Sequence, residues 1–212
     1  PQIKKLAVQS NTYFASILPW LNEKIDIVLL GSASNLLMPD YATVQEALAH
    51  SPDALIITHI GGYPNPYIAD IANLCKKKGV LLIEDCAHSP LAKINERYVG
   101  TFGQASILSF FPTKPIPAGE GGLLILKEES LSNEAKRLRN YGKLTTSAGV
   151  LHKLPACVNA RMSEFTATIV NTLLKHYAQI QSHKSHLAKI YDSYLKEKSF
   201  LHLYPDSIKL EP

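Results

Sequence analysis

Apolar residues in this chain gather in short unbroken runs instead of alternating with polar ones. Runs of this kind at 6–8, 25–30, 54–60, 80–83, 105–108 and 123–126 predict β-strands that are buried on both faces. Residues 67–78 are predicted to form a helix, because their apolar positions recur at helical spacing and Gly79 follows as a cap. Buried strands that alternate with helices are typical of an α/β fold with a mostly parallel central sheet flanked by helices.

Further helices are predicted at 12–20, capped by Asn11 or Thr12, at 44–50 after Thr43, and at 131–139. The stretch 141–158 is irregular and polar, which is typical of a loop. One long helix is predicted from Ser163 to residue 195, with a length that suits an arm leading to another domain. We therefore divide the chain into a large α/β domain, residues 1–160, and the long helix with the start of a small C-terminal domain, residues 161–212.

Composition narrows the class of protein. A net charge of +4 on 212 residues is too small to indicate nucleic-acid binding. Three cysteines without a CxxC pair disfavour a disulfide framework or a zinc site, and His183 and His186 have no third ligand near them in the sequence. Without a signal peptide or an apolar run that would span a bilayer, we expect a cytoplasmic protein with no metal, nucleic acid or membrane as partner.

A loop at 109–122 separates the last two predicted strands and holds a hydroxyl, a lysine next to a proline, and a cluster of glycines. A lysine in a tight, partly apolar loop at a strand end is placed to act as an amine nucleophile. Taken alone, Lys114 is better explained as an exposed residue of a surface loop. Its meaning depends on which groups lie beside it in the fold.

Asp85 directly follows a buried strand and precedes Cys86, Ala87 and His88. A carboxylate in a cleft of low dielectric needs a cationic or proton-donating partner, although Asp85 alone would also serve as a turn cap. Functional loops of parallel sheets gather beyond the carboxyl ends of the strands, so the loops after Ile60, from Asp85 and around Lys114 are expected to converge. A lysine with a carboxylate suits pyridoxal 5′-phosphate (PLP), which has an aldehyde and a basic ring nitrogen.

Several motifs along nearly the whole chain resemble the DegT/DnrJ/EryC1/StrS family of sugar aminotransferases, in the family's order. They are SNTYFA at 10–15, HIGG at 59–62, IEDCAHS at 83–89, GTFG at 100–103, SFFPTK at 109–114, GEGG at 119–122, RLRNYG at 137–142 and NARMSEFTA at 159–167. The resemblance implies a PLP-dependent transferase of fold type I, similar in fold to aspartate aminotransferase, that works as a homodimer with shared active sites. It implies transamination of a nucleotide-linked keto sugar, with glutamate as the amino donor, for amino-sugar biosynthesis.

The resemblance also implies roles for particular residues. Lys114 matches the lysine that holds PLP as a Schiff base and then shuttles a proton, and Asp85 matches the carboxylate that keeps the pyridine nitrogen protonated. His88 matches the residue at the ring hydroxyl, Ser109 a hydroxyl that binds the phosphate, and Tyr13 an aromatic ring against the cofactor face. From the residues alone, Tyr13 is also explained as core and Ser109 as a turn cap.

Two further residues are assigned across a dimer interface by the resemblance. Asn159 looks like the residue that reaches the partner's phosphate, and Arg161 is expected to bind a substrate anion. The alternative is that both are ordinary helix-entry residues, since Asn is a good cap and Arg often pairs at the surface.

The chain departs from the family in length. Members are longer, and their phosphate cradle includes a Ser-Gly-Thr turn at a helix N-terminus, a strong anion site, which we expect upstream of Pro1. We therefore expect this chain to be a piece of a longer enzyme, with most of the small C-terminal domain absent. The alternative is a truncated, catalytically silent paralogue or subunit that acts by dimerisation. A plain nucleotide-binding domain is disfavoured, because no GxGxxG or GxxxxGK motif occurs.

Overall fold

The computed structural model describes residues 2–34, 36–146, 149–152, 157–196 and 210–211. Its centre is a six-stranded sheet in the order β2-β1-β3-β4-β7-β8. The strands are β1 (Lys5–Gln9), β2 (Asp26–Leu30), β3 (Ala54–Thr58), β4 (Leu81–Asp85), β7 (Ala105–Ser109) and β8 (Gly122–Leu126). All neighbours pair in parallel except β8, which runs antiparallel to β7 at one edge. The predicted α/β fold with a mostly parallel sheet is confirmed.

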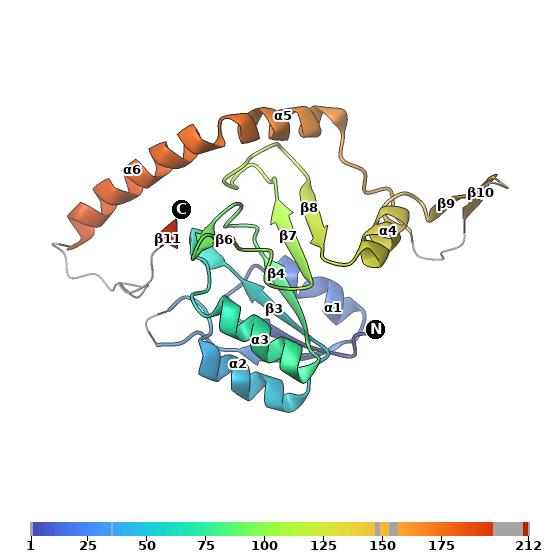
Figure 1. Cartoon of the computed structure of the whole chain (residues 1–212), viewed down its shortest axis with the longest axis horizontal. Coiled ribbons are helices and arrows are strands. Elements are labelled where there is room, and N and C mark those ends of the chain that lie inside the picture. The colour runs from blue at the N-terminus through green and yellow to red at the C-terminus, as the bar shows by residue number, and fades with distance from the viewer. Residues whose placement is uncertain (1, 35, 147–148, 153–156, 197–209, 212) are drawn as a thin grey trace.

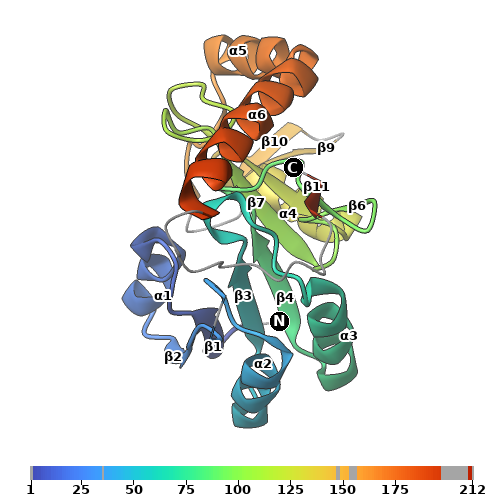
Figure 2. The same cartoon turned by 90° about the vertical axis from the view of Figure 1, so that its left-hand side faces the viewer.

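Helices cover both faces of the central strands, as Figure 2 shows. On one face lie α2 (Tyr41–Ala47) and α3 (Ile68–Lys78), and on the other lies α1 (Leu18–Asn22). Successive strand side chains point to opposite faces, so Ala7 and Leu55 join the α2 and α3 core, whereas Leu6 and Ile56 pack toward α1. Because both faces are buried, the strand sequences are continuous apolar runs.

The remaining elements are short, except for two helices that form an arm along one side of the sheet (Figure 1). The two arm helices are α5 (Glu164–Lys175) and α6 (Tyr177–Lys196). The other elements are η1 (Phe14–Ser16), η2 (Leu48–His50), η3 (Ile60–Gly62), β5 (Lys93–Ile94), β6 (Arg97–Tyr98), α4 (Glu129–Leu138), β9 (Lys143–Thr146), β10 (Gly149–His152) and β11 (Leu210–Glu211). Among the helices in the described part of the chain, none combines the length and the apolar character needed to cross a membrane.

The predicted helix at 12–20 is wrong in its detail. The segment forms η1 followed by the separate helix α1, and the residue before η1 is Tyr13, which makes no side-chain cap. Pro19 lies in the first turn of α1, where its missing N–H is tolerated, so it starts a new helix instead of continuing one. Thr12 is therefore not a helix cap, and its hydroxyl is used elsewhere.

Three other predictions needed correction. The helix expected at 44–50 begins at Tyr41, because the Asp40 side chain accepts a hydrogen bond from the Thr43 N–H and caps it. Residues 141–158 are not wholly irregular, since β9 and β10 pair as an antiparallel hairpin, although 147–148 and 153–156 lie outside the described residues. The long helix breaks at His176, whose φ and ψ are −102° and 6°, without a glycine or proline to signal it.

Candidate functional site

A cavity of about 510 Å³ opens at the carboxyl ends of β3, β4 and β7. It brings together five of the seven residues that the sequence singled out: Tyr13, Asp85, His88, Ser109 and Lys114. The loops that carry them lie far apart in the chain and meet because their parallel strands end at the same edge of the sheet.

Asp85 is the last residue of β4, whereas the sequence pattern placed it just after the strand. It is 5% exposed. Its Oδ1 accepts a hydrogen bond of 3.0 Å from the Ala87 N–H, and its Oδ2 accepts one of 2.8 Å from the Ser16 hydroxyl. Asp85 thus caps the turn that follows the strand and also lines the cavity. Because both oxygens act as acceptors, the carboxylate is held in one plane.

The loop that carries Lys114 is anchored by apolar packing against α5. Phe110, Ile116 and Ala118 are buried in a cluster with Val170 of α5. The Lys114 N–H donates to the Phe111 carbonyl at 2.9 Å, which closes a turn. The half-buried Lys114 side chain is consequently presented to the cavity by a loop whose neighbouring residues are fixed in a core. It is not the fully exposed surface lysine of the alternative interpretation.

Ser109 is the last residue of β7 and His88 lies on the loop that follows β4; both are half-buried. The Ser109 oxygen accepts a hydrogen bond of 3.3 Å from the Phe111 N–H, so it caps a turn as well as lining the cavity. His88 accepts through Nδ1 from the Gly61 N–H at 3.2 Å. Burial lowers the pKa of His88, the positive charge of Lys114 lowers it further, and the negative charge of Asp85 acts in the opposite direction.

Tyr13 is not a core residue. Its side chain is 59% exposed at the border of the cavity, and its ring packs against Phe14 with centroids 4.3 Å apart. Exposure of a large aromatic ring beside a cavity suits contact with a flat ligand.

Asn159 and Arg161 lie outside this cavity. Both are exposed, and both are tied to Asn140: Asn159 by an isolated backbone bridge, Arg161 by a hydrogen bond of 2.8 Å to the Asn140 side chain. The resemblance assigned Asn159 to the cofactor of a partner subunit, and a position away from this chain's own cavity is compatible with that role.

Three hydroxyl residues near the cavity were not assigned a role in the site from the sequence. Ser16 holds Asp85, Thr12 lies 3.3 Å from the Ser16 oxygen, and Thr58 at the end of β3 lies 2.7 Å from the Thr12 oxygen. Asp85 and Ser16 are separated by 69 positions, so no local pattern links them. Only the pairing of β1, β3 and β4 brings these hydroxyls together.

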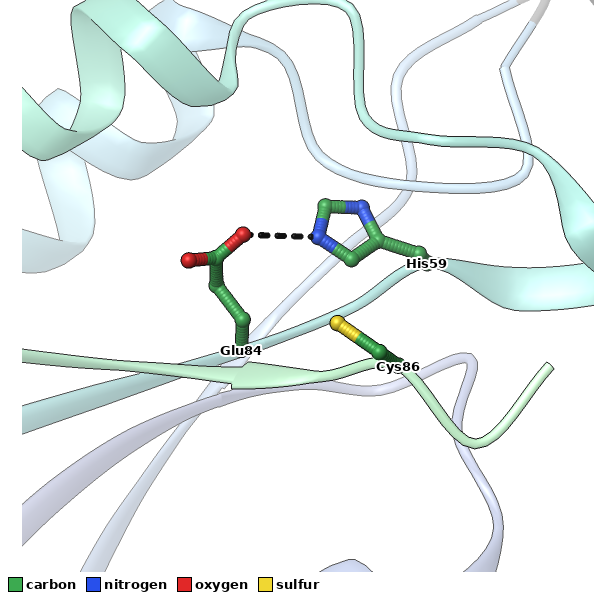
Figure 3. Close-up of side chains that lie close together, drawn as sticks. All are labelled: His59, Glu84 and Cys86. Atoms are coloured by element: carbon green, nitrogen blue, oxygen red, sulfur yellow. Dashed lines mark hydrogen bonds and ion pairs between the residues drawn. The ribbon is translucent and has the colours of Figure 1, made fainter. Parts of the chain in front are cut away.

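A buried carboxylate, Glu84, lies behind the cavity on the neighbouring position of β4. Its oxygens accept hydrogen bonds from the N–H groups of Gly100 (2.7 Å), Phe102 (2.7 Å) and Gly103 (2.6 Å), and from His59 Nε2 (3.2 Å), the contact drawn in Figure 3. Burial alone would raise the pKa of Glu84, but these hydrogen bonds outweigh it and hold the pKa below its usual range.

His59, Glu84 and Cys86 lie close enough to suggest a metal site, but the donor atoms of His59 and Glu84 already take part in hydrogen bonds, one of which is drawn in Figure 3. His59 Nδ1 accepts from the Asn65 N–H at 2.9 Å, so the ring proton lies on Nε2 and is donated to Glu84. Burial raises the pKa of the Cys86 thiol, and the nearby carboxylates raise it further, which keeps the sulfur protonated. A metal ion would have to displace these hydrogen bonds. We therefore assign the cluster of His59, Glu84 and Cys86 a structural role.

The central sheet and its connections have the α/β fold of solved aminotransferase structures. Among solved structures, PseC from Helicobacter pylori, an aminotransferase involved in the biosynthesis of pseudoaminic acid, matches with a TM-score of 0.86 and 21% identity. The match covers 93% of this chain and 53% of PseC.

The sequence profile of the DegT/DnrJ/EryC1/StrS aminotransferase family matches residues 3–207, and the chain belongs to this family. GDP-perosamine synthase from Vibrio cholerae is 34% identical over 152 residues, which are 72% of this chain and 41% of the synthase. dTDP-3-amino-3,6-dideoxy-alpha-D-galactopyranose transaminase from Aneurinibacillus thermoaerophilus is 30% identical over 200 residues, 94% of this chain and 53% of that enzyme. The chain spans about half the length of these relatives. Members of the family bind PLP.

Glu84→Gln is expected to lower the free energy of unfolding by about 3 kcal/mol, because the amide would turn an N–H₂ group toward buried N–H donors. The depressed pKa of Glu84 also has a pH consequence: its stabilisation is present above its ordinary pKa and is lost as pH falls through the lower folded value. Urea unfolding at several pH values measures both the loss of unfolding free energy and its pH dependence. In the Glu84→Gln variant, the unfolding free energy should fall less steeply as the pH is lowered.

The matched control is Glu46→Gln on the exposed face of α2, which should change the unfolding free energy little. Equal effects of the two substitutions would contradict the structural role of Glu84.

His88 is expected to titrate below its ordinary range in an NMR titration of the cofactor-free protein. Lys114→Gln should raise the pKa of His88, because a nearby positive charge is removed, and Asp85→Asn should lower it, because a negative charge is removed. If the two substitutions shift the pKa in the same direction, the three groups do not share one electrostatic environment.

Proposed function

We propose that the protein of which this chain is part is a PLP-dependent aminotransferase that acts on a nucleotide-linked keto sugar, with glutamate as the amino donor. The observation that carries the proposal is the convergence of a lysine amine, a buried carboxylate and a hydroxyl in one cavity: Lys114, Asp85 and Ser109. The names of the relatives support the substrate class, because they include enzymes of GDP-linked and dTDP-linked amino sugars.

The residues present fit the cofactor. Lys114 would hold it covalently, Asp85 would accept a hydrogen bond from its ring nitrogen, and Ser109 would bind its phosphate. His88 would contact the ring hydroxyl, and Tyr13 would lie against the ring face. When bound, PLP supplies an electron sink for the bond that breaks next to the transferred amine.

Asp85 suits a protonated ring nitrogen for a physical reason. Each of its oxygens already accepts one hydrogen bond from a donor of this chain, which fixes the carboxylate in place and leaves further lone pairs for another donor. A carboxylate that is 5% exposed forms a strong, charge-assisted hydrogen bond with a cationic N–H group. Asp85 therefore favours the protonated ring, in which the cofactor withdraws electrons best.

His88 is suited to donate rather than accept. The Gly61 N–H occupies Nδ1, so the proton of the neutral ring lies on Nε2. This leaves Nε2–H as a donor for an anionic oxygen. Its lowered pKa keeps the ring neutral, so it adds no second positive charge beside Lys114.

Lys114 Nζ is the proposed acid and base. Once released from its covalent role, the amine takes the proton from the substrate carbon and later returns one, in both halves of the reaction. Anchoring of its loop through Phe110 and Ile116 restricts where the amine can move, which is what proton transfer between fixed atoms requires.

We further propose a cytoplasmic homodimer with shared active sites, in which Asn159 and Arg161 serve the partner's cofactor and substrate. Residues 1–160 would belong to the large PLP-binding domain, and 161–212 would lead into the small one. The alternative is a catalytically silent paralogue or subunit that acts by dimerisation.

Borohydride reduction of the complete, PLP-loaded protein is expected to fix the cofactor to Lys114, detected by peptide mass spectrometry. Lys114→Ala should abolish both the label and the visible absorbance of bound PLP, because Lys114 is the only lysine among the described residues that line the cavity. The exposed Lys127→Ala is the matched control and should keep both. A protein without visible PLP absorbance favours the silent paralogue, and label on another lysine contradicts the assignment of Lys114.

A further inference from the structure

Three hydroxyl side chains form a directed chain of hydrogen bonds that ends on Asp85. The Ser16 hydroxyl donates to Asp85 Oδ2 at 2.8 Å, and the Thr12 hydroxyl donates to the Ser16 oxygen at 3.3 Å. The oxygens of Thr12 and Thr58 lie 2.7 Å apart. Since Thr12 has one hydroxyl proton and gives it to Ser16, the donor in this last contact is Thr58. Every proton in the chain therefore points toward the carboxylate.

The distal end of this chain is fixed by the sheet. Thr58 is 3% exposed and pairs directly with Asp85 across β3 and β4. Its N–H donates to the side chain of Gln9, a buried residue of β1 whose amide donates to the Asn11 carbonyl. The loop that carries Thr12 and Ser16 is thus tied to β1 and β3, and its hydroxyls are held where Asp85 needs them.

Ser16 does not have a competing structural task that explains its orientation. The cap of η1 is Tyr13, which precedes it, and the cap of α1 is Ile17, which follows it, neither with a side-chain capping bond. The hydroxyl of Ser16 faces the cavity and bonds to a side chain 69 positions away. Without Ser16, this buried carboxylate would keep one oxygen without a donor from the part of the chain that the structure describes.

We propose that Ser16 is a positioning residue for the cofactor: it fixes the plane of the Asp85 carboxylate so that the carboxylate meets the protonated nitrogen of a pyridine ring. This inference rests on the proposed PLP function. Ser16 acts only through Asp85, on the ring nitrogen and not on the phosphate or the aldehyde. Thr12 and Thr58 orient the Ser16 hydroxyl, with the longer Thr12 contact as the weaker link.

The test compares PLP affinity in four forms of the complete protein: wild type, Ser16→Ala, Asp85→Ala and the double variant, by equilibrium titration of the visible absorbance. Ser16→Ala is expected to weaken PLP binding by about tenfold, the order of magnitude for one hydrogen bond to a charged group. In the Asp85→Ala background the same substitution should have no further effect, because Ser16 has nothing to position. A merely structural Ser16 would weaken binding equally in both backgrounds.

A second ligand separates positioning from folding damage. An analogue of PLP in which carbon replaces the ring nitrogen should bind Ser16→Ala and wild type equally, because it offers no N–H group to Asp85. Ser16→Thr, which keeps the hydroxyl, should restore PLP affinity to within about threefold of wild type, and the exposed Ser32→Ala should leave it unchanged.

Equal losses for PLP and the analogue, or equal effects of Ser16→Ala in both Asp85 backgrounds, would overturn the role of Ser16 and leave the PLP function standing. Failure of the wild-type protein to bind PLP at all would overturn the proposed function, and this inference with it.

Discussion

The hydrogen bonds that surround Glu84 are the constraint on which the site depends. Adjacent side chains of a strand point to opposite faces, so whatever fixes Glu84 also fixes the direction of Asp85. Three backbone N–H groups and His59 hold Glu84 on one side of β4, and Asp85 is consequently presented to the cavity on the other. A slip of one residue in the β4 register would exchange the two carboxylates, and the buried N–H groups of 100–103 oppose it.

A second constraint fixes the position of the loop that carries Lys114, which extends beyond the strands and is not held by the sheet. The loop extends beyond β7 and returns as β8, the antiparallel edge strand. Its buried residues pack against Val170 of α5, and Gly121 returns the chain with a φ of +129° that other residues rarely adopt. The carboxylate is thus fixed by hydrogen bonds in the sheet, whereas the amine is fixed by apolar packing on a helix. The arm formed by α5 and α6 therefore matters for the site although it supplies none of the groups that line this cavity (Figure 1).

The strands, their burial and the convergence of the Asp85 and Lys114 loops were predictable from the sequence, because a doubly covered parallel sheet leaves unbroken apolar runs and gathers its loops at one edge. The family motifs in these two loops also identified Asp85 and Lys114 as site residues. Ser16 was not predictable, since its role depends on Asp85, a residue 69 positions away. Glu84 was passed over because its partners are backbone N–H groups, which carry no sequence signal. The helix break at His176 lacks a glycine or proline and was missed for the same kind of reason.

The placement of Asn159 and Arg161 bears on why a shared site would suit this fold. The groups that line the cavity come from strand ends and from the loops beyond them, whereas Asn159 and Arg161 lie outside the cavity, are exposed and are bonded to Asn140. Arg161 is further held over the Tyr141 ring, 5.5 Å from its centroid. Exposed polar groups lose rotamer entropy when they bind a ligand, and contacts that already fix them reduce that cost. Asn159 and Arg161 are therefore pre-organised on the exposed surface of the chain, as the proposed shared site would require.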